Sequence, residues 1–389
     1  MIKYNENLYK LEQGNGFSNL NVKVQEFKEN NPDVEVLSLG IGDVSMPIIG
    51  PIIDSMHIAV DELGDISTFK GYGNYYGIES LRKTILENDY KDLEFSLDEI
   101  YISNGTKSDM ANILELFDKD INIYTTDPGY TVYRDGALLL GRNIDSIPIS
   151  EENDFKPVIP NNRYDVIYLC SPNNPIGNTL NKEDLSKWVE YALINNSIIL
   201  YDNVYSPFIR SEDVPLSIYE IEGARKCSIE FKSFSKTASF TGVRCSYYLI
   251  PNDIDENINK LWKKRTLNRT NGVDYIAQKG AEESYSNESK RLLKQNINIY
   301  LDNASILREC FESLNHKVWG GIDSPYLWIK INNEMNSWEF FEHFLNDLNI
   351  IIVPGSIFGE NGEGYFRISS LGKKDDIISA VERIKKYYE

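Results

Sequence analysis

The residues best suited to chemistry lie in one short stretch, residues 233–244, which reads Ser-Phe-Ser-Lys-Thr-Ala-Ser-Phe-Thr-Gly-Val-Arg. Lys236 stands there among small hydroxyl residues, and Arg244 follows eight positions later. A lysine amine in such a turn suits an aldehyde cofactor that is held as a Schiff base. Ser233, Ser235 and Arg244 are of the kinds that bind a phosphate. The stretch therefore predicts a pyridoxal phosphate site, against the simpler interpretation of solvated loop charges beside an edge strand.

Five further polar residues suit the same cofactor. Asp202 ends an apolar run of strand length and can pair with the pyridine nitrogen, which keeps the ring protonated and able to accept electrons. Asn174 and Tyr205 can hydrogen-bond the phenolic oxygen of the ring, and Tyr130 can stack on the ring face. Arg367 can bind a substrate carboxylate through two parallel hydrogen bonds. Each residue alone also fits an ordinary cap, turn or surface position, but the five in this order favour a cofactor site.

Two glycine-rich segments precede these residues. Residues 100–109 read as a strand and a turn, followed by a helix that we expect over Met110–Phe117. Backbone N–H groups at a helix start bind phosphate, so Gly105, Thr106 and Lys107 are candidates for that role. Residues 71–77 hold three glycines and three aromatic side chains. They fit either an aromatic contact to a ligand or a tight structural turn.

Composition excludes several classes of protein. The chain has 389 residues, 41% hydrophobic and 25% charged, as in a soluble globular enzyme of two or three domains. Its net charge of −19 makes nucleic acid and an anionic membrane surface poor partners. No run of about 18 apolar residues occurs, and we expect a cytoplasmic protein. The four cysteines form no CxxC pair and the three histidines show no metal-ligand spacing, so we expect reduced thiols and no metal.

The middle of the chain alternates strands with helices, a pattern typical of parallel βαβ units. Short apolar runs predict strands over residues 121–125, 166–170, 197–201 and 227–231. A helical pattern lies between them over residues 182–195. We therefore predict an α/β domain whose mostly parallel sheet has helices on both faces and binds its ligand beyond the carboxyl ends of the strands.

The C-terminal part shows a different, α+β pattern. It predicts a long helix over residues 290–315, strands over 326–331 and 350–353, and a last helix over 375–388. An amphipathic helix ending near Asn31 is expected to pack on this part. We predict an N-terminal arm with part of the small domain (1–45), a large cofactor-binding domain (46–285) and a C-terminal small domain (286–389).

These motifs resemble those of the fold-type-I pyridoxal phosphate aminotransferases, over nearly the whole length of the chain. Within that group the sequence looks most like the LL-diaminopimelate aminotransferases. The resemblance is carried by residues 39–43, 71–73, 171–177, 217–223, 233–236, 240–244, 354–356 and 358–359. It implies an enzyme that moves an amino group between an amino acid and a 2-oxo acid.

The resemblance also implies a role for each site residue. Lys236 is the Schiff-base lysine and the proton shuttle, and Asp202 and Tyr130 are catalytic with it. The cofactor is held in addition by Asn174, Tyr205, Ser233, Arg244, Thr106 and the backbone near Lys107. The substrate is expected at Gly42, Asn15, Tyr75, Lys107, Asn174 and Arg367, with Arg367 on the α-carboxylate. Tyr72 and Asn271 match residues that the family lends to the cofactor site of the neighbouring subunit, so a homodimer is implied.

Some positions depart from the family pattern. Tyr75 and Tyr76 stand where the family has a glutamate and a glutamine, and that glutamate helps to hold the distal ammonium of diaminopimelate. Asn15 stands where the family has a tyrosine, and residues 273–275 are Val-Asp-Tyr rather than small and polar. We therefore predict an intact cofactor site, an altered distal pocket and poor activity on LL-diaminopimelate, although Asp274 can compensate from another direction.

Other functions stay open at this point. A genuine LL-diaminopimelate aminotransferase, or a pyridoxal phosphate lyase, decarboxylase or oxidase, uses the same Lys236 and Asp202. A cofactor-sensing regulator needs a basic helix-turn-helix segment, which this acidic sequence does not show. An inactive relative is expected to lose Lys236 or Asp202, and both are present.

Overall fold

The structure, a computed structural model, describes residues 2–11, 16–40 and 42–388. Its largest element is a seven-stranded sheet with the strand order β2-β8-β7-β6-β5-β3-β4. The strands are β2 (Ile100–Ser103), β3 (Ile123–Asp127), β4 (Ile144–Pro148), β5 (Val166–Cys170), β6 (Ile198–Asp202), β7 (Ser228–Ser233) and β8 (Ser246–Leu249). In this sheet β8 is antiparallel to β2 and β7, and the other paired strands are parallel. The sheet is thus mostly parallel, as the sequence predicts.

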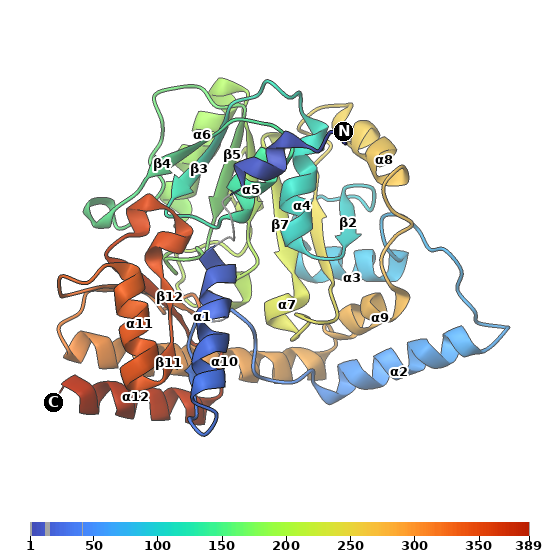
Figure 1. The fold of residues 1–389 in the computed structure, drawn as a ribbon. Helices are drawn as coiled ribbons and strands as arrows, with labels where there is room; N and C mark the ends of the chain where they lie inside the picture. Colours follow the sequence, from blue (N-terminus) through green and yellow to red (C-terminus); the bar gives the residue numbers. More distant parts are fainter. Residues whose placement is uncertain (1, 12–15, 41, 389) are drawn as a thin grey trace.

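Helices cover both faces of this sheet (Figure 1). They are α2 (Gly50–Gly64), α3 (Glu79–Asp89), α4 (Thr106–Asn112), α5 (Val132–Leu139), α6 (Lys182–Asn195), α7 (Phe234–Thr237), α8 (Ile258–Leu267) and α9 (Tyr275–Glu283). Side chains of α4, α5 and α8 pack with Leu200 and Phe231 on one face. Side chains of α2, α3, α6 and α9 pack with Ile199 and Tyr201 on the other. The central strands are therefore buried on both sides, which explains their continuous apolar runs.

The helix α6 shows how the local sequence sets an element. Its N-cap residue Asn181 accepts a hydrogen bond from the N–H of Asp184 (2.9 Å), and the Asp184 carboxylate accepts one from the N–H of Asn181 (3.3 Å). This reciprocal pair satisfies two N–H groups that a helix start leaves without partners. The helix ends where Asn196 takes a left-handed conformation, with φ 50°. The sequence prediction for residues 182–195 is confirmed.

A second region combines segments from the two ends of the chain. An antiparallel sheet has the order β12-β13-β10-β9, and β1 pairs with β11 in parallel. The elements are α1 (Gly16–Asn30), β1 (Leu37–Ser38), α10 (Asn287–Ser313), β9 (Val318–Gly320), β10 (Tyr326–Lys330), α11 (Ser337–Leu348), β11 (Ile350–Ile351), β12 (Val353–Pro354), β13 (Tyr365–Ser369) and α12 (Lys374–Tyr388). Figure 1 shows α1 beside α11, and Leu20 of α1 belongs to the same hydrophobic core. The domain bounds at 45 and 285 stay a prediction.

Two predicted elements differ in kind or extent from the structure, whereas other predicted bounds are displaced by one to three residues, as in β3 and α10. The helix expected over Met110–Phe117 begins earlier, as α4, and continues as a 3-10 helix over Ile113–Leu116. It begins early because Gly105 takes φ 137° and starts the helix directly after the turn. The strand expected over 350–353 is two short strands, because β11 pairs with β1 whereas β12 pairs with β13. No helix within the described ranges is long and apolar enough to span a membrane.

Candidate active site

A cavity of about 520 Å³ lies where β6 and β7 end. Twelve residues named from the sequence line it: Gly42, Thr106, Lys107, Tyr130, Asn174, Asp202, Tyr205, Ser233, Ser235, Lys236, Arg244 and Arg367. Gly105 caps the helix that carries two of them. The parallel strands thus bring residues that are far apart in sequence to one edge of the sheet, as the α/β pattern predicts.

Asp202 is the buried carboxylate of this cavity. Its Oδ2 accepts a hydrogen bond from the Tyr133 hydroxyl at 2.6 Å, whereas its Oδ1 is buried without a hydrogen-bond partner. Burial raises the pKa of Asp202 to about 6, and the hydrogen bonds from Tyr133 and the Val204 backbone act in the opposite direction. A cation or N–H donor at Oδ1 supplies the missing partner, and the protonated nitrogen of a pyridine ring is such a group.

Tyr133 holds this carboxylate in place and is a residue that the sequence reading missed. It lies on α5, three positions after Tyr130, and is buried. Its ring stacks on Tyr168 with centroids 4.6 Å apart and meets Tyr130 edge to face at 5.5 Å. The motif Tyr-x-x-Tyr, at the spacing of one helical turn, is the signal that could have pointed to it.

Lys236 lies on the one-turn helix α7, which follows β7 directly. Its Nζ donates a hydrogen bond to the backbone carbonyl of Gly42. Burial lowers the pKa of Lys236, which increases the fraction of neutral amine at a given pH. A neutral amine is the form that attacks an aldehyde, so the position suits covalent attachment of a cofactor.

Ser233, Ser235 and Arg244 form a cluster beside this lysine. The Ser233 hydroxyl accepts a hydrogen bond from the N–H of Ser235 at 3.1 Å, and Arg244 Nη1 donates to Ser235 Oγ at 3.3 Å. Gly105 lies beside this guanidinium, since a Cβ there would be 2.0 Å from Arg244 Nη2, and its φ of 137° favours glycine at this position. Arg244 thus lies against the start of α4 near Thr106, where N–H groups and a guanidinium together suit a phosphate.

Arg367 is a buried cation on β13, with 3% of its surface exposed. It donates from Nη1 to Asn174 Oδ1 and from Nη2 to the carbonyl of Gly40, both at 2.8 Å, and its Nε has no partner. The guanidinium lies over the Tyr326 and Phe358 rings, 4.4 and 4.8 Å from their centroids. No carboxylate pairs with it among the described residues, so it can bind the carboxylate of a ligand.

Aromatic side chains form another part of the cavity wall. The hydroxyl groups of Tyr205 and Tyr326 lie 2.8 Å apart, and both side chains are buried. Tyr326 is a second residue that the sequence reading missed, because nothing in its local strand pattern distinguishes it from core. Phe17 and Asn21 of α1 also line the cavity and were not predicted. Their position depends on packing between the two ends of the chain, which local sequence does not reveal.

Besides Gly105, three predicted residues in the described part of the chain do not line the cavity. Tyr72 has 90% of its surface exposed, Asn271 is exposed, and Tyr75 is half-buried outside the cavity. Asn15 lies outside the described residues. Exposure is what the sequence prediction requires of Tyr72 and Asn271, since the resemblance assigns both to the site of a neighbouring subunit.

The residues present fit pyridoxal phosphate. The cavity offers an amine at Lys236, a buried carboxylate oxygen without a partner at Asp202, and hydroxyl and cationic groups for a phosphate at Ser235 and Arg244. Each of these groups would bind a different part of the cofactor.

Comparison with known proteins establishes the family. The model of the family described as aminotransferase class I and II matches residues 34–384. The chain belongs to this family. The aminotransferase is 43% identical to the LL-diaminopimelate aminotransferase of Bacteroides thetaiotaomicron over an alignment of 409 residues that covers 100% of both chains. It is 42% identical to that of Bacteroides fragilis over 407 residues, with 99% of each chain covered.

Solved structures give the same result. The LL-diaminopimelate aminotransferase of Chlamydomonas reinhardtii aligns with a TM-score of 0.94 at 34% identity, covering 100% of this chain and 99% of that one. A Thermus thermophilus aspartate aminotransferase double mutant aligns with a TM-score of 0.87 at 18% identity, covering 99% and 100%, which shows a common fold. The aminotransferase therefore has the fold-type-I architecture, uses pyridoxal phosphate, and acts on amino acids and 2-oxo acids, as the sequence predicts.

Proposed function

We propose that this aminotransferase transfers an amino group from LL-diaminopimelate to a 2-oxo acid. The similarity to LL-diaminopimelate aminotransferases over the whole chain carries the proposal. The Chlamydomonas enzyme aligns with a TM-score of 0.94, compared with 0.87 for the Thermus aspartate aminotransferase. The sequence identities, 34% and 18%, differ in the same direction.

In this proposal Lys236 has two tasks. Its amine would hold the cofactor, and the same nitrogen would accept the proton of the substrate Cα. The bound cofactor supplies the electron sink for the charge that develops at Cα. The pKa of Lys236 is lowered by burial, which keeps part of the amine free of its own proton and able to accept this one.

The other residues hold charges in fixed places. Asp202 Oδ1 would accept a hydrogen bond from the protonated ring nitrogen, and the Tyr133 hydroxyl, which donates to Oδ2, favours the ionised carboxylate and orients it. Arg367 binds the α-carboxylate, with Asn174 beside it. Ser235 and Arg244 bind the phosphate. Because these partners are already in position, little reorganisation is needed when charge moves.

The proposal includes a homodimer in which each active site takes residues from both chains. It also places the enzyme in the cytoplasm. Tyr72 and Asn271 are exposed and lie outside the cavity of their own chain. The net charge of −19 argues against binding of the protein to an anionic membrane surface.

A second candidate is an aminotransferase for an amino acid with a less polar side chain. Phe17 and Leu20 line the cavity, and Asp43 and Asp202 are the carboxylates among its described lining residues. A distal ammonium in a partly dry pocket needs a paired carboxylate. Tyr75, in place of the family's glutamate, removes one such partner, and a charge-assisted contact of this kind is worth about 1.5–3 kcal/mol.

Steady-state assays separate the two candidates. The ratio kcat/KM is measured for LL-diaminopimelate with 2-oxoglutarate and for a panel of single amino acids. The first candidate predicts that LL-diaminopimelate has the highest value. If another amino acid exceeds it by tenfold or more, the second candidate holds, and Tyr75→Glu should then raise the value for LL-diaminopimelate whereas the uncharged control Tyr75→Gln should not.

A further inference from the structure

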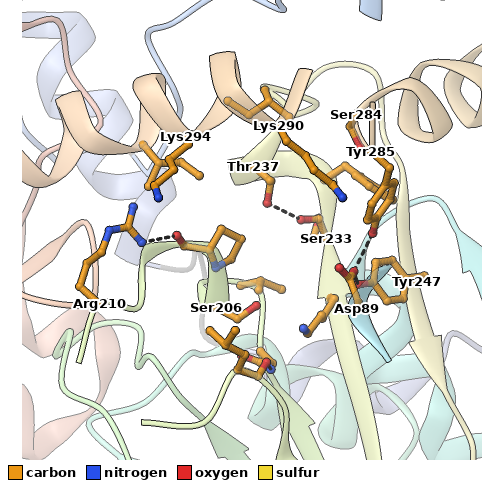
Figure 2. A pocket seen from close by; sticks show the side chains of 18 residues that line it. Asp89, Ser206, Arg210, Ser233, Thr237, Tyr247, Ser284, Tyr285, Lys290 and Lys294 are labelled. Atoms are coloured by element: carbon orange, nitrogen blue, oxygen red, sulfur yellow. Dashed lines mark hydrogen bonds between the residues drawn. The ribbon is translucent and has the colours of Figure 1, made fainter. Parts of the chain in front are cut away.

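A second cavity, of about 320 Å³, lies between the N-terminal half of α10 and the ends of β6 and β7 (Figure 2). Its size is at the lower end of the range for small-molecule sites. It shares Val204 and Ser233 with the cofactor cavity, and its other lining residues are different. It is therefore a separate compartment beside the cofactor site.

Four cations line this cavity: Arg210, Lys232, Lys290 and Lys294. None of them forms an ion pair among the residues that the structure describes. Arg210 donates to backbone carbonyls and to the Asn298 amide oxygen, Lys290 donates to the Asn88 amide oxygen at 2.5 Å, and Lys232 lies 5.4 Å from the centroid of the Tyr90 ring. In a chain with a net charge of −19, this concentration of cations without carboxylate partners favours an anion.

Asp89 is the carboxylate that lines the cavity, and it is already engaged. Its Oδ2 accepts hydrogen bonds from the hydroxyl groups of Tyr247 at 2.5 Å and Tyr285 at 2.7 Å. Figure 2 shows this group on one side of the cavity, with Lys294 and Arg210 on the other and Lys290 reaching in from α10. The described lining thus carries four positive charges and one negative charge, and no ion pair joins Asp89 to any of the four cations.

The inner part of the cavity is apolar. Phe234, Leu293 and Ile297 are buried there, and Pro207 lines the cavity with them. Apolar surface of this kind favours the apolar part of a ligand, while the cations lie at the mouth, where Lys290, Lys294 and Arg210 are exposed. The cavity therefore suits a molecule with an apolar body and one anionic end.

We propose that this cavity binds a small carboxylate with an aliphatic or aromatic body, its carboxylate at Lys290 and Lys294 and its body against Leu293 and Phe234. The bound molecule contacts Ser233 and Thr237, which flank Lys236 in the same short segment. The site thus lies on the far side of the segment that carries the cofactor lysine. This inference is independent of which amino acid the enzyme transaminates.

The probe is 4-phenylbutyrate, and its binding to the cofactor-loaded enzyme is measured by calorimetry and ligand-observed NMR. Arg367 in the active site also attracts carboxylates, so an Arg367→Ala chain is titrated in parallel. We expect saturable binding that Arg367→Ala retains. The double variant Lys290→Gln/Lys294→Gln should bind at least about tenfold more weakly, since two charge contacts are lost. Lys385→Gln/Lys386→Gln, which removes two exposed lysines of α12, is the matched control and should bind like the wild type.

Two further measurements test the cavity from its mouth and from the ligand. Leu216 is 56% exposed, so Leu216→Asp leaves the fold intact, adds a negative charge at the mouth and should weaken binding. The neutral analogue 4-phenylbutanol should bind at least about tenfold more weakly than the acid. The proposal is overturned if binding is absent, if it disappears in Arg367→Ala, or if acid and alcohol bind equally. It is also overturned if the lysine variants change the oligomer mass while leaving binding unchanged, since the cations then serve contacts between chains.

Discussion

The floor of the active site and its rim differ in how they are held. The floor, which consists of Asp202, Tyr133, Asn174 and Arg367, is buried or bonded within one chain, with hydrogen bonds of 2.6 and 2.8 Å. The residues predicted for the rim are Tyr72, Tyr75 and Asn271, which lie outside the cavity of their own chain. They have no side-chain hydrogen bond within the residues that the structure describes, and Tyr72 is 90% exposed. One chain thus presets the charges for chemistry, and under the proposed function a second chain would supply Tyr72 and Asn271.

Among changes to the floor, loss of Lys236 should lower kcat the most. Lys236→Ala removes both the covalent anchor and the proton carrier, and we expect kcat to fall by about 10⁴-fold or more. The exposed Lys187→Ala serves as the control and should leave kcat unchanged. Borohydride reduction and peptide mapping of the wild type should place the phosphopyridoxyl group on Lys236. A label on another lysine contradicts the assignment.

Asp202→Ala should have the next largest effect. The change leaves the proton-bearing ring nitrogen without its buried partner, and the loss in kcat should be on the order of 10²–10⁴. Steady-state rates at saturating substrate and cofactor measure this. If the variant turns over substrate nearly as fast as the wild type, a group other than Asp202 stabilises the protonated ring nitrogen.

Arg367→Lys tests the substrate side of the floor. Lysine keeps the charge but loses the planar pair of donors, so kcat/KM should fall about 10²-fold with a smaller change in kcat. Arg308→Lys, on α10 away from the cavity, is a matched control. An unchanged KM shows that the α-carboxylate is bound elsewhere.

Tyr133→Phe should have the smallest effect of this series. The ring and its stacking on Tyr168 stay, and one hydrogen bond to Asp202 is lost, so kcat should fall about tenfold. That bond lowers the pKa of Asp202, so its loss raises this pKa, and the acid limb of the rate profile should move to higher pH. Tyr168→Phe is the control, because its hydroxyl bonds the Met110 carbonyl instead. A tenfold loss without the pH shift indicates a packing role only.

The sequence predicted the parts of the fold and site that local pattern determines. Asp202 was found because it ends a buried apolar strand, and Lys236 because it lies three residues beyond the end of a neighbouring strand, in a turn rich in hydroxyl residues; parallel strands bring such positions together. Tyr133 and Tyr326 were missed because each is an aromatic residue inside a helix or strand. At such a position the sequence alone does not distinguish a core residue from a functional one. The start of α4 was misplaced because Gly105 reads as a turn, and its φ of 137° is known only from the structure. Phe17 reaches the cavity through contacts between distant segments, which no local pattern contains.

The central claim, that one chain supplies the floor and another the rim, is tested most directly by mixing two inactive variants. Lys236→Ala chains are exchanged with Tyr72→Phe/Asn271→Ala chains, and subunit exchange is verified by mass. Each hybrid dimer then holds one whole site, so activity should recover to at most about a quarter of the wild-type value, since random exchange makes half of the dimers hybrid. A mixture of Lys236→Ala with Asp202→Ala chains is the control and should stay inactive, because both lesions lie in the floor. Equal recovery in both mixtures, or none in the first despite exchange, contradicts the claim.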